Sequence, residues 1–317
     1  MNSRIAGFWA GLPPAGGGIV MATGIVSIGT HMIGQELLSK VLMVLAGAVW
    51  IGLAAVFSFR LTRQHSLWLS EAATPPALTG VAGTCVLGTR LALFGWTSVA
   101  VAMLLIGALA WPVLLVSVVA HWHRGMQGAV FLVTVATQGL SVLCATLAGI
   151  WTLGWLALIA LVFLLLGLLL YLDALYRFDL RQVRIGAGDQ WVAGGALAIS
   201  ALAASKLTAF REWTGAPHTV LRVLTLVLLA LELSWYAVVA VAEVLWPRPR
   251  YDIRRWATVF PMGMSAAAAL STSSAADIAW LEGFGKVLLW VSLVAWALTA
   301  FGLVRAWMRE VRKEAST

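Results

Sequence analysis

Three ionisable side chains lie within long apolar stretches of the sequence, where a charge has to be accommodated. Arg90 falls near the end of the run 75–95, Lys206 near the end of 190–208, and Glu232 near the middle of 219–246. At the centre of a membrane a charged side chain costs about 2.5 to 3.5 kcal/mol on insertion scales, so such residues are usually functional. The two cations could concentrate anions at a pore mouth, and the carboxyl could carry a proton.

Each of these residues also has a structural interpretation. Arg90 and Lys206 are at the ends of their runs, from which long side chains can reach the headgroups. Glu232 is in a bulky run of the lipid-facing kind, which favours a neutral or hydrogen-bonded carboxyl over a proton carrier. The runs rich in small residues have no Asp or Glu in their middles, whereas cation pathways normally use acidic rings, so the composition favours anions.

Other reactive side chains do not form a catalytic or metal-binding pattern. The histidines of "HWHR" (121–124) are two residues apart, so they do not share a helix face, and no Cys, Asp or Glu cluster accompanies them. Asp173, Asp179 and Asp189 are scattered among arginines without metal-ligand spacing. We therefore expect no enzyme activity, no metal and no cofactor, and the alternative of an intramembrane lipid-modifying enzyme is the weaker one.

The elements that position these residues are membrane-spanning helices. Of the 317 residues, 61% are apolar and 11% are charged, and the mean hydropathy is +0.93. The apolar segments are long enough to cross about 30 Å of hydrocarbon at 1.5 Å per residue, and they lack the alternation of β-strands. The sequence predicts an all-α polytopic membrane protein with one transmembrane domain, 1–317, and ten spans: 13–32, 39–59, 75–95, 97–120, 127–148, 150–172, 190–208, 219–246, 255–275 and 283–307.

The ten spans alternate between two kinds. The odd spans are rich in Gly, Ala, Ser and Thr, as in "WVAGGALAISALAAS", and the even spans are bulky, as in "LIALVFLLLGLLLY". Bulky side chains suit lipid, while small residues let backbones approach or line a narrow space. We predict five tandem helical hairpins, with inner odd helices around a central pore and outer even helices facing lipid.

Small and polar residues mark the expected pore lining. The stretch "GGGIVMATGIVSIGTH" (16–31) has five glycines, and polar residues recur at i, i+3, i+4 and i+7 in the fifth span. The alternative is that these hydroxyls bond to carbonyls of their own helix or to a neighbouring helix. The residues predicted to line the pore are Gly18, Thr23, Gly24, Ser27, Gly83, Thr84, Gly88, Thr134, Thr137, Gln138, Ser141, Gly194, Ala198, Ala201, Met264 and Ser265.

The basic residues predict the orientation. The net charge of +8 is spread over short connections, which agrees with the positive-inside rule and not with nucleic-acid binding. With the N-terminus in the cytoplasm, most of the 21 lysines and arginines fall on the cytoplasmic side. The exceptions are Lys40, Arg90, Lys206, Arg211, Arg222 and Lys286. We predict a multi-pass protein of the plasma (inner) membrane with both termini cytoplasmic.

Two motifs, "GGGIVMATGIVSI" in the first span and "RWATVFPMGMSAAAAL" at the ninth, resemble the tellurite-resistance/dicarboxylate transporter family. That family includes tellurite-resistance permeases, fungal malate permeases, sulfite efflux pumps and the plant slow anion channels. The resemblance implies a homotrimer in membrane lipid, with a pore in each subunit for small inorganic or carboxylate anions such as chloride, nitrate, sulfite or malate. It leaves open a passive channel or a proton-coupled dicarboxylate or sulfite carrier.

The resemblance also implies a phenylalanine gate in the ninth span. Phe260 matches the gate position, and Pro261 follows it directly. Proline removes one backbone hydrogen bond and bends a helix, which can push the preceding ring toward the axis.

Overall fold

The computed structural model describes residues 14–248 and 251–314, and within them the chain is helical, without a strand. The start of the first predicted span at residue 13, together with Arg4 and Arg250, lies outside the described residues. The ten long helices are α2 (Gly17–Met32), α3 (Glu36–Arg63), α5 (Thr79–Leu93), α6 (Thr97–Val119), α7 (Leu132–Trp151), α8 (Gly154–Arg177), α10 (Val192–Thr208), α11 (Ala216–Leu245), α12 (Trp256–Ala276) and α13 (Trp280–Glu314). Two short helices that the sequence did not predict, α4 (His65–Ala72) and α9 (Gln182–Ile185), lie in connections.

The long helices divide into an enclosed set and a peripheral set. In an apolar window of 18 residues within each of the segments of α2, α5, α7 and α10, 78 to 100% of the residues are buried inside the protein. The corresponding shares for α3, α6, α8, α11 and α13 are 17 to 28%. The peripheral helices carry the bulky residues that the sequence assigned to lipid contact, because large apolar side chains are stable in hydrocarbon.

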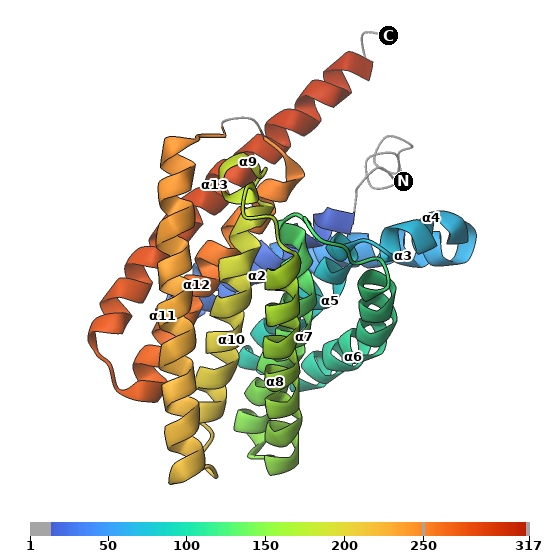
Figure 1. Cartoon of the computed structure of the whole chain (residues 1–317). Helices are drawn as coiled ribbons and strands as arrows, with labels where there is room; N and C mark the ends of the chain where they lie inside the picture. Colours follow the sequence, from blue (N-terminus) through green and yellow to red (C-terminus); the bar gives the residue numbers. More distant parts are fainter. Residues whose placement is uncertain (1–13, 249–250, 315–317) are drawn as a thin grey trace.

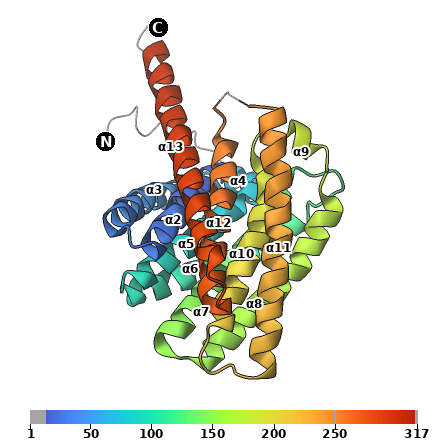
Figure 2. The ribbon, with the colours of Figure 1, turned by 90° about the vertical axis from the view of Figure 1, so that its left-hand side faces the viewer.

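The enclosed helices pack in chain order. α2 contacts α5, α5 contacts α7, α7 contacts α10 and α10 contacts α12, and α12 packs back against α2. Each enclosed helix also packs against the peripheral helix that follows it in the sequence. Helices α8, α10 and α11 run along the long direction of Figure 1, and α13 crosses them obliquely. The last turns of α13 extend beyond the other helices, as Figure 2 shows from the side.

Each enclosed helix begins with a 3₁₀ turn. The turns are η1 (Pro14–Gly16), η2 (Pro75–Leu78), η3 (Gly128–Phe131), η4 (Asp189–Trp191) and η5 (Ile253–Arg255), and η1 contacts both η2 and η5. The carboxylate of Asp189 accepts from the backbone N–H of Ala129 at 3.2 Å and so caps the neighbouring turn. Asp252 caps η5, and the hydrogen bonds from Arg254 hold the pKa of Asp252 below its ordinary value.

Nine helices in the described part of the chain are long and apolar enough to cross a membrane, and α12 is not among them. The sequence predicts the corresponding segment, 255–275, as the ninth of ten spans. Helix α12 ends in the polar run Ser271–Ser274, and it packs against α2, α10, α11 and α13. A helix surrounded in this way meets little lipid, so its composition need not suit hydrocarbon.

Close contact between α2 and α5 depends on glycine. A Cβ on Gly17 would lie 2.3 Å from Thr79 Oγ1, and that hydroxyl is held by the carbonyls of Pro14 and Pro76 at 2.8 and 2.7 Å. A Cβ on Gly80, in contrast, would have no neighbour within 4 Å. Position 17 therefore has no room for a methyl group, whereas position 80 has room for one.

We expect Gly17→Ala to lower the stability of the purified protein by about 1 to 3 kcal/mol, because the added methyl separates two packed helices. Gly80→Ala is the matched control and should be neutral or slightly stabilising, since alanine favours helix. Thermal unfolding in detergent measures both variants. Equal midpoints for the two would contradict the close packing of α2 on α5.

Candidate functional site

The polar side chains of α7 point to the peripheral helices. Gln138 Nε2 donates to the carbonyl of Leu164 in α8 at 3.0 Å, and Ser141 Oγ donates to that of Ala160 at 2.7 Å. The third member of the periodic set, Thr137, accepts a hydrogen bond from a tryptophan of α6 at 2.9 Å. Thr134 is fully buried, and its hydroxyl has no partner among the described residues. This pattern matches the alternative in which the hydroxyls bond to neighbouring helices.

The same orientation recurs in other enclosed helices. Ser27 of α2 donates to the carbonyl of Ser39 in α3 at 2.7 Å. Thr23 accepts from Trp296 Nε1 of α13 at 2.9 Å, and Thr84 of α5 accepts from Trp50 Nε1 of α3 at 2.8 Å. These predicted lining residues thus join the enclosed helices to the peripheral ones.

The predicted lining glycines occupy helix contacts. A Cβ on Gly24 would lie 2.8 Å from Val86 Cγ1 of α5, and one on Gly194 would lie 2.8 Å from Trp235 Cδ1 of α11. Gly18, Gly83 and Gly88 similarly face Trp256, Val20 and Leu143. Ala198 and Ala201 of α10 are completely buried. The small residues thus allow close helix packing.

Contacts account for most faces of α12. Pro261 faces Gly195 of α10, Gly263 faces Ile25 of α2, and Ala266 belongs to a cluster with leucines of α13. At about 100° per residue, Phe260 and Met264 lie roughly 120° and 160° around the helix from Ala266. They therefore occupy the face turned away from α13.

Phe260 and Met264 are both 1% exposed. Ser265, which the sequence grouped with them as lining, points to the peripheral helix α11, where its hydroxyl is hydrogen-bonded to Glu232. The next residue along the chain from Met264 thus faces a different neighbour, because a step of one residue turns a helix by about 100°.

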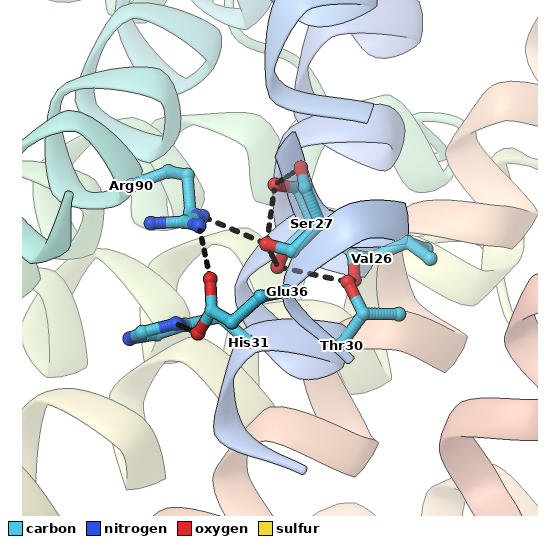
Figure 3. A network of polar contacts seen from close by, with 7 residues as sticks. Val26, Ser27, Thr30, His31, Glu36 and Arg90 are labelled. Carbon is cyan, nitrogen blue, oxygen red and sulfur yellow. Dashed lines mark hydrogen bonds and ion pairs between the residues drawn. The ribbon is translucent and has the colours of Figure 1, made fainter. Parts of the chain in front are cut away.

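Arg90 is buried in a polar network at the junction of α2, α3 and α5. Its Nε donates to Ser39 Oγ at 2.9 Å, and its Nη2 lies 3.5 Å from the carboxylate of Glu36. Glu36 is also hydrogen-bonded to the ring of His31. Figure 3 shows the guanidinium directed at Glu36, with Ser27 and His31 beside the pair. Only 1% of Arg90 is exposed, and Glu36 compensates its charge in part, while neither Nη atom has a hydrogen-bond partner among the described residues.

Lys206 differs from Arg90 in its surroundings. It is half-buried in the last turn of α10, and it forms no ion pair with any residue of the described ranges. It lies about 20° around α10 from Gly195, which faces Pro261 of α12. The structure therefore separates the two predicted anion-attracting residues into a paired one and an unpaired one.

Glu232 projects from α11 toward α12 and is 1% exposed. One carboxyl oxygen contacts the hydroxyl of Ser265, and that hydroxyl is also 2.9 Å from the carbonyl of Pro261. The sequence predicts Glu232 on an outer helix away from the pore, and it does not indicate which way the side chain points. Helix α11 is peripheral, but the carboxyl of Glu232 reaches α12, the enclosed helix that carries Phe260.

Sequence reasoning missed Glu36 and Ser39. Glu36 is the one acidic residue between the first two spans, and its charge is opposite to that of Arg90. That complementarity could have suggested a pair. The separation of 54 positions gives no indication of distance, and the contact depends on how α3 packs against α5.

In its described ranges the chain is all-helical and has nine apolar helices that could span a membrane, four of them enclosed and five peripheral. These features define a multi-pass membrane protein. The chain belongs to the voltage-dependent anion channel family, whose model matches residues 11–304. A comparison with curated proteins gave no match. The match confirms the predicted resemblance over nearly the whole chain. The family implies anion channel or transporter activity and anion substrates, and its members are not enzymes.

We expect Ser39→Ala to destabilise the protein by about 1 to 3 kcal/mol, because it removes the hydrogen-bond acceptor of a buried guanidinium. Ser234→Ala is the control, since that hydroxyl is exposed and bonds only to the carbonyl of Ala230 in its own helix at 2.8 Å. Thermal unfolding in detergent measures the difference. A loss no larger than that of the control would mean that the Arg90 network contributes little to stability.

Proposed function

We propose that the protein conducts or transports small anions through the space enclosed by α2, α5, α7, α10 and α12, and that Phe260 gates this pathway. One observation carries the proposal: a buried aromatic ring lies next to a proline on the face of α12 turned away from its peripheral partner. The closed packing order of the five helices and the family match support it.

An apolar ring can close such a pathway without any charge. Water leaves a narrow apolar constriction, so ions cannot pass until the ring moves. Because several polar side chains of the enclosed helices bond to the peripheral helices, the enclosed faces are left with apolar groups such as Phe260 and Met264. In this proposal anion preference comes from charge near the mouth, for which Lys206 is the candidate.

The finer assignments complete the proposal. All ten long helices cross the plasma (inner) membrane as one transmembrane domain, with both termini cytoplasmic, and three copies assemble with one pathway each. Chloride, nitrate, sulfite and C4-dicarboxylates such as malate are the candidate anions. Flux into liposomes with each anion in turn identifies the substrate.

We expect Phe260→Ala to increase anion flux strongly in liposomes while preserving the preference for anions, because the ring provides the block and the field comes from elsewhere. Phe260→Leu should be intermediate. Phe301→Ala, which removes a 64% exposed ring from α13, is the control and should conduct like the parent. A folded Phe260→Ala protein of the parent's oligomeric size with unchanged flux would refute the gate.

We expect Lys206→Gln to reduce anion flux more at low than at high ionic strength, since Lys206 is half-buried and salt screens the field of the solvent-accessible part over about 10 Å at 0.1 M. Lys286→Gln is the control, because that lysine is on α13 and pairs with Glu282 at 2.6 Å. Flux measured over a series of salt concentrations separates the two. An equal loss at every concentration would exclude a long-range electrostatic role for Lys206.

A further inference from the structure

We propose that Glu232 and Ser265 are positioning residues for the gate, and that the protonated carboxyl of Glu232 holds Phe260 in its closed position through Ser265 and the carbonyl of Pro261. This inference rests on the proposed function, because it assigns a control to the same Phe260 gate. It is carried by the contacts between α11 and α12.

The Ser265 hydroxyl contacts more hydrogen-bond acceptors than it has protons. The Ser265 hydroxyl has one proton, and two acceptors lie next to it: a carboxyl oxygen of Glu232 and the carbonyl oxygen of Pro261. A hydroxyl has one proton and makes one strong, linear hydrogen bond, so both contacts are strong at the same time only if the second proton comes from Glu232. A protonated Glu232 donates to Ser265 Oγ, and Ser265 donates to Pro261.

The surroundings of Glu232 agree with the neutral form. The carboxyl is 1% exposed, and it forms no ion pair with the residues described. Its second oxygen has no hydrogen-bond partner among them. A buried carboxylate without a countercharge is costly, whereas a neutral carboxyl with one hydrogen bond is tolerated.

Few charged or titratable groups face Glu232. From its own helix, the phenol of Tyr236 is near enough to interact electrostatically. From α12, the hydroxyl of Ser265 is the polar group in contact. The apolar cluster beside them contains Leu288 and Leu289 of α13 and Ala266 of α12. Helix α10 also packs against α11, and its one ionisable residue, Lys206, forms no ion pair with Glu232. We therefore assign a change in the charge of this site to Glu232.

The mechanical link is the weakened helix around Phe260. Pro261 has no N–H, so the carbonyl of Ala257 loses its helical donor. A serine hydroxyl that bonds to the carbonyl four residues earlier, as Ser265 does, also bends a helix. The missing bond lies in the turn 257–261 that carries Phe260, and the serine bond lies in the next turn, 261–265. Because the two turns meet at Pro261, the ring position is sensitive to whether Ser265 bonds to Pro261.

Loss of the proton changes this arrangement. A carboxylate accepts the Ser265 proton in a stronger, charge-assisted hydrogen bond, so the carbonyl of Pro261 loses its hydroxyl donor. We infer that the turn then relaxes and Phe260 leaves the closed position. Anion flux should be low when Glu232 is protonated and should rise with pH as the carboxyl ionises.

The test is anion flux in liposomes at equal pH on both sides, so that no proton gradient drives transport. We expect flux of the parent protein to rise roughly tenfold with pH, a size typical of a buried charge-assisted hydrogen bond. Glu232→Gln keeps a donor for Ser265 and should stay at the low flux at every pH. Ser265→Ala should conduct more than the acidic parent without pH dependence, and Ser265→Thr should restore the pH profile.

Two further variants separate this inference from the proposed function. In Phe260→Ala, flux should be high at every pH, because the element that Glu232 controls is gone. Ser200→Ala is the matched control, since that buried hydroxyl bonds to the carbonyl of Ala196 at 2.7 Å in the same i−4 manner and has no hydrogen bond to Glu232. It should keep the parent's pH profile.

The outcomes are distinct. A parent protein whose flux does not depend on pH, or a Glu232→Gln protein with the parent's pH profile, would overturn the role of Glu232 and Ser265 and leave the Phe260 gate intact. A third result is high flux in Phe260→Ala that still depends on pH, with the dependence lost when Glu232→Gln is added. That result would place Glu232 on the ion path or in proton coupling, and it would also overturn the control of the gate by Glu232. Unchanged flux in Phe260→Ala would instead reject the proposed gate.

Discussion

The structure depends on one constraint: a polar side chain in a membrane-spanning helix must find its hydrogen-bond partner inside the protein, because hydrocarbon offers none. Several polar side chains of the enclosed helices meet this constraint by bonding outward to the peripheral helices. Gln138 and Ser141 reach carbonyls of α8, Ser27 reaches α3, and Thr23 accepts from a tryptophan of α13. These bonds tie each small-residue helix to bulkier neighbours, and the glycines between them allow the close approach.

This arrangement has a consequence for the enclosed space. Where the polar groups are directed outward, the opposite faces of the same helices carry apolar groups, and on α12 these are Phe260 and Met264. An apolar passage is closed by a single ring and opened by a small displacement. The composition that keeps the helices stable in lipid is thus compatible with a hydrophobic gate, and Pro261 weakens the helix at the position where that gate has to move.

Two buried ionisable groups, Arg90 and Glu232, are accommodated differently: Arg90 by an ion pair and Glu232 without one among the described residues. Arg90 is paired with Glu36 and donates to Ser39, and these contacts compensate its charge in part at the junction of three helices. Glu232 forms no ion pair in the described chain: one of its oxygens contacts a serine and the other has no partner there, which is why we infer a neutral carboxyl. In the first arrangement the guanidinium keeps its charge over a wide pH range. The second depends on a proton, and this difference is why Glu232 is the better candidate for control.

The sequence by itself determined the membrane class, the approximate bounds of the long helices and the division into small-residue and bulky helices, because hydropathy and side-chain size are local properties. It also carried the motifs on which the family resemblance rested. Only the tertiary structure decided which neighbour each polar face meets. Periodicity placed Thr137, Gln138 and Ser141 on one face, but a polar face can be satisfied by water in a pore or by an adjacent helix. In the structure α7 packs against α6 and α8, and these three side chains are hydrogen-bonded to those adjacent helices. In the same way, the pairing of Arg90 with Glu36 and the reach of Glu232 to Ser265 depend on how separate helices rotate against one another, which no single segment of the sequence specifies.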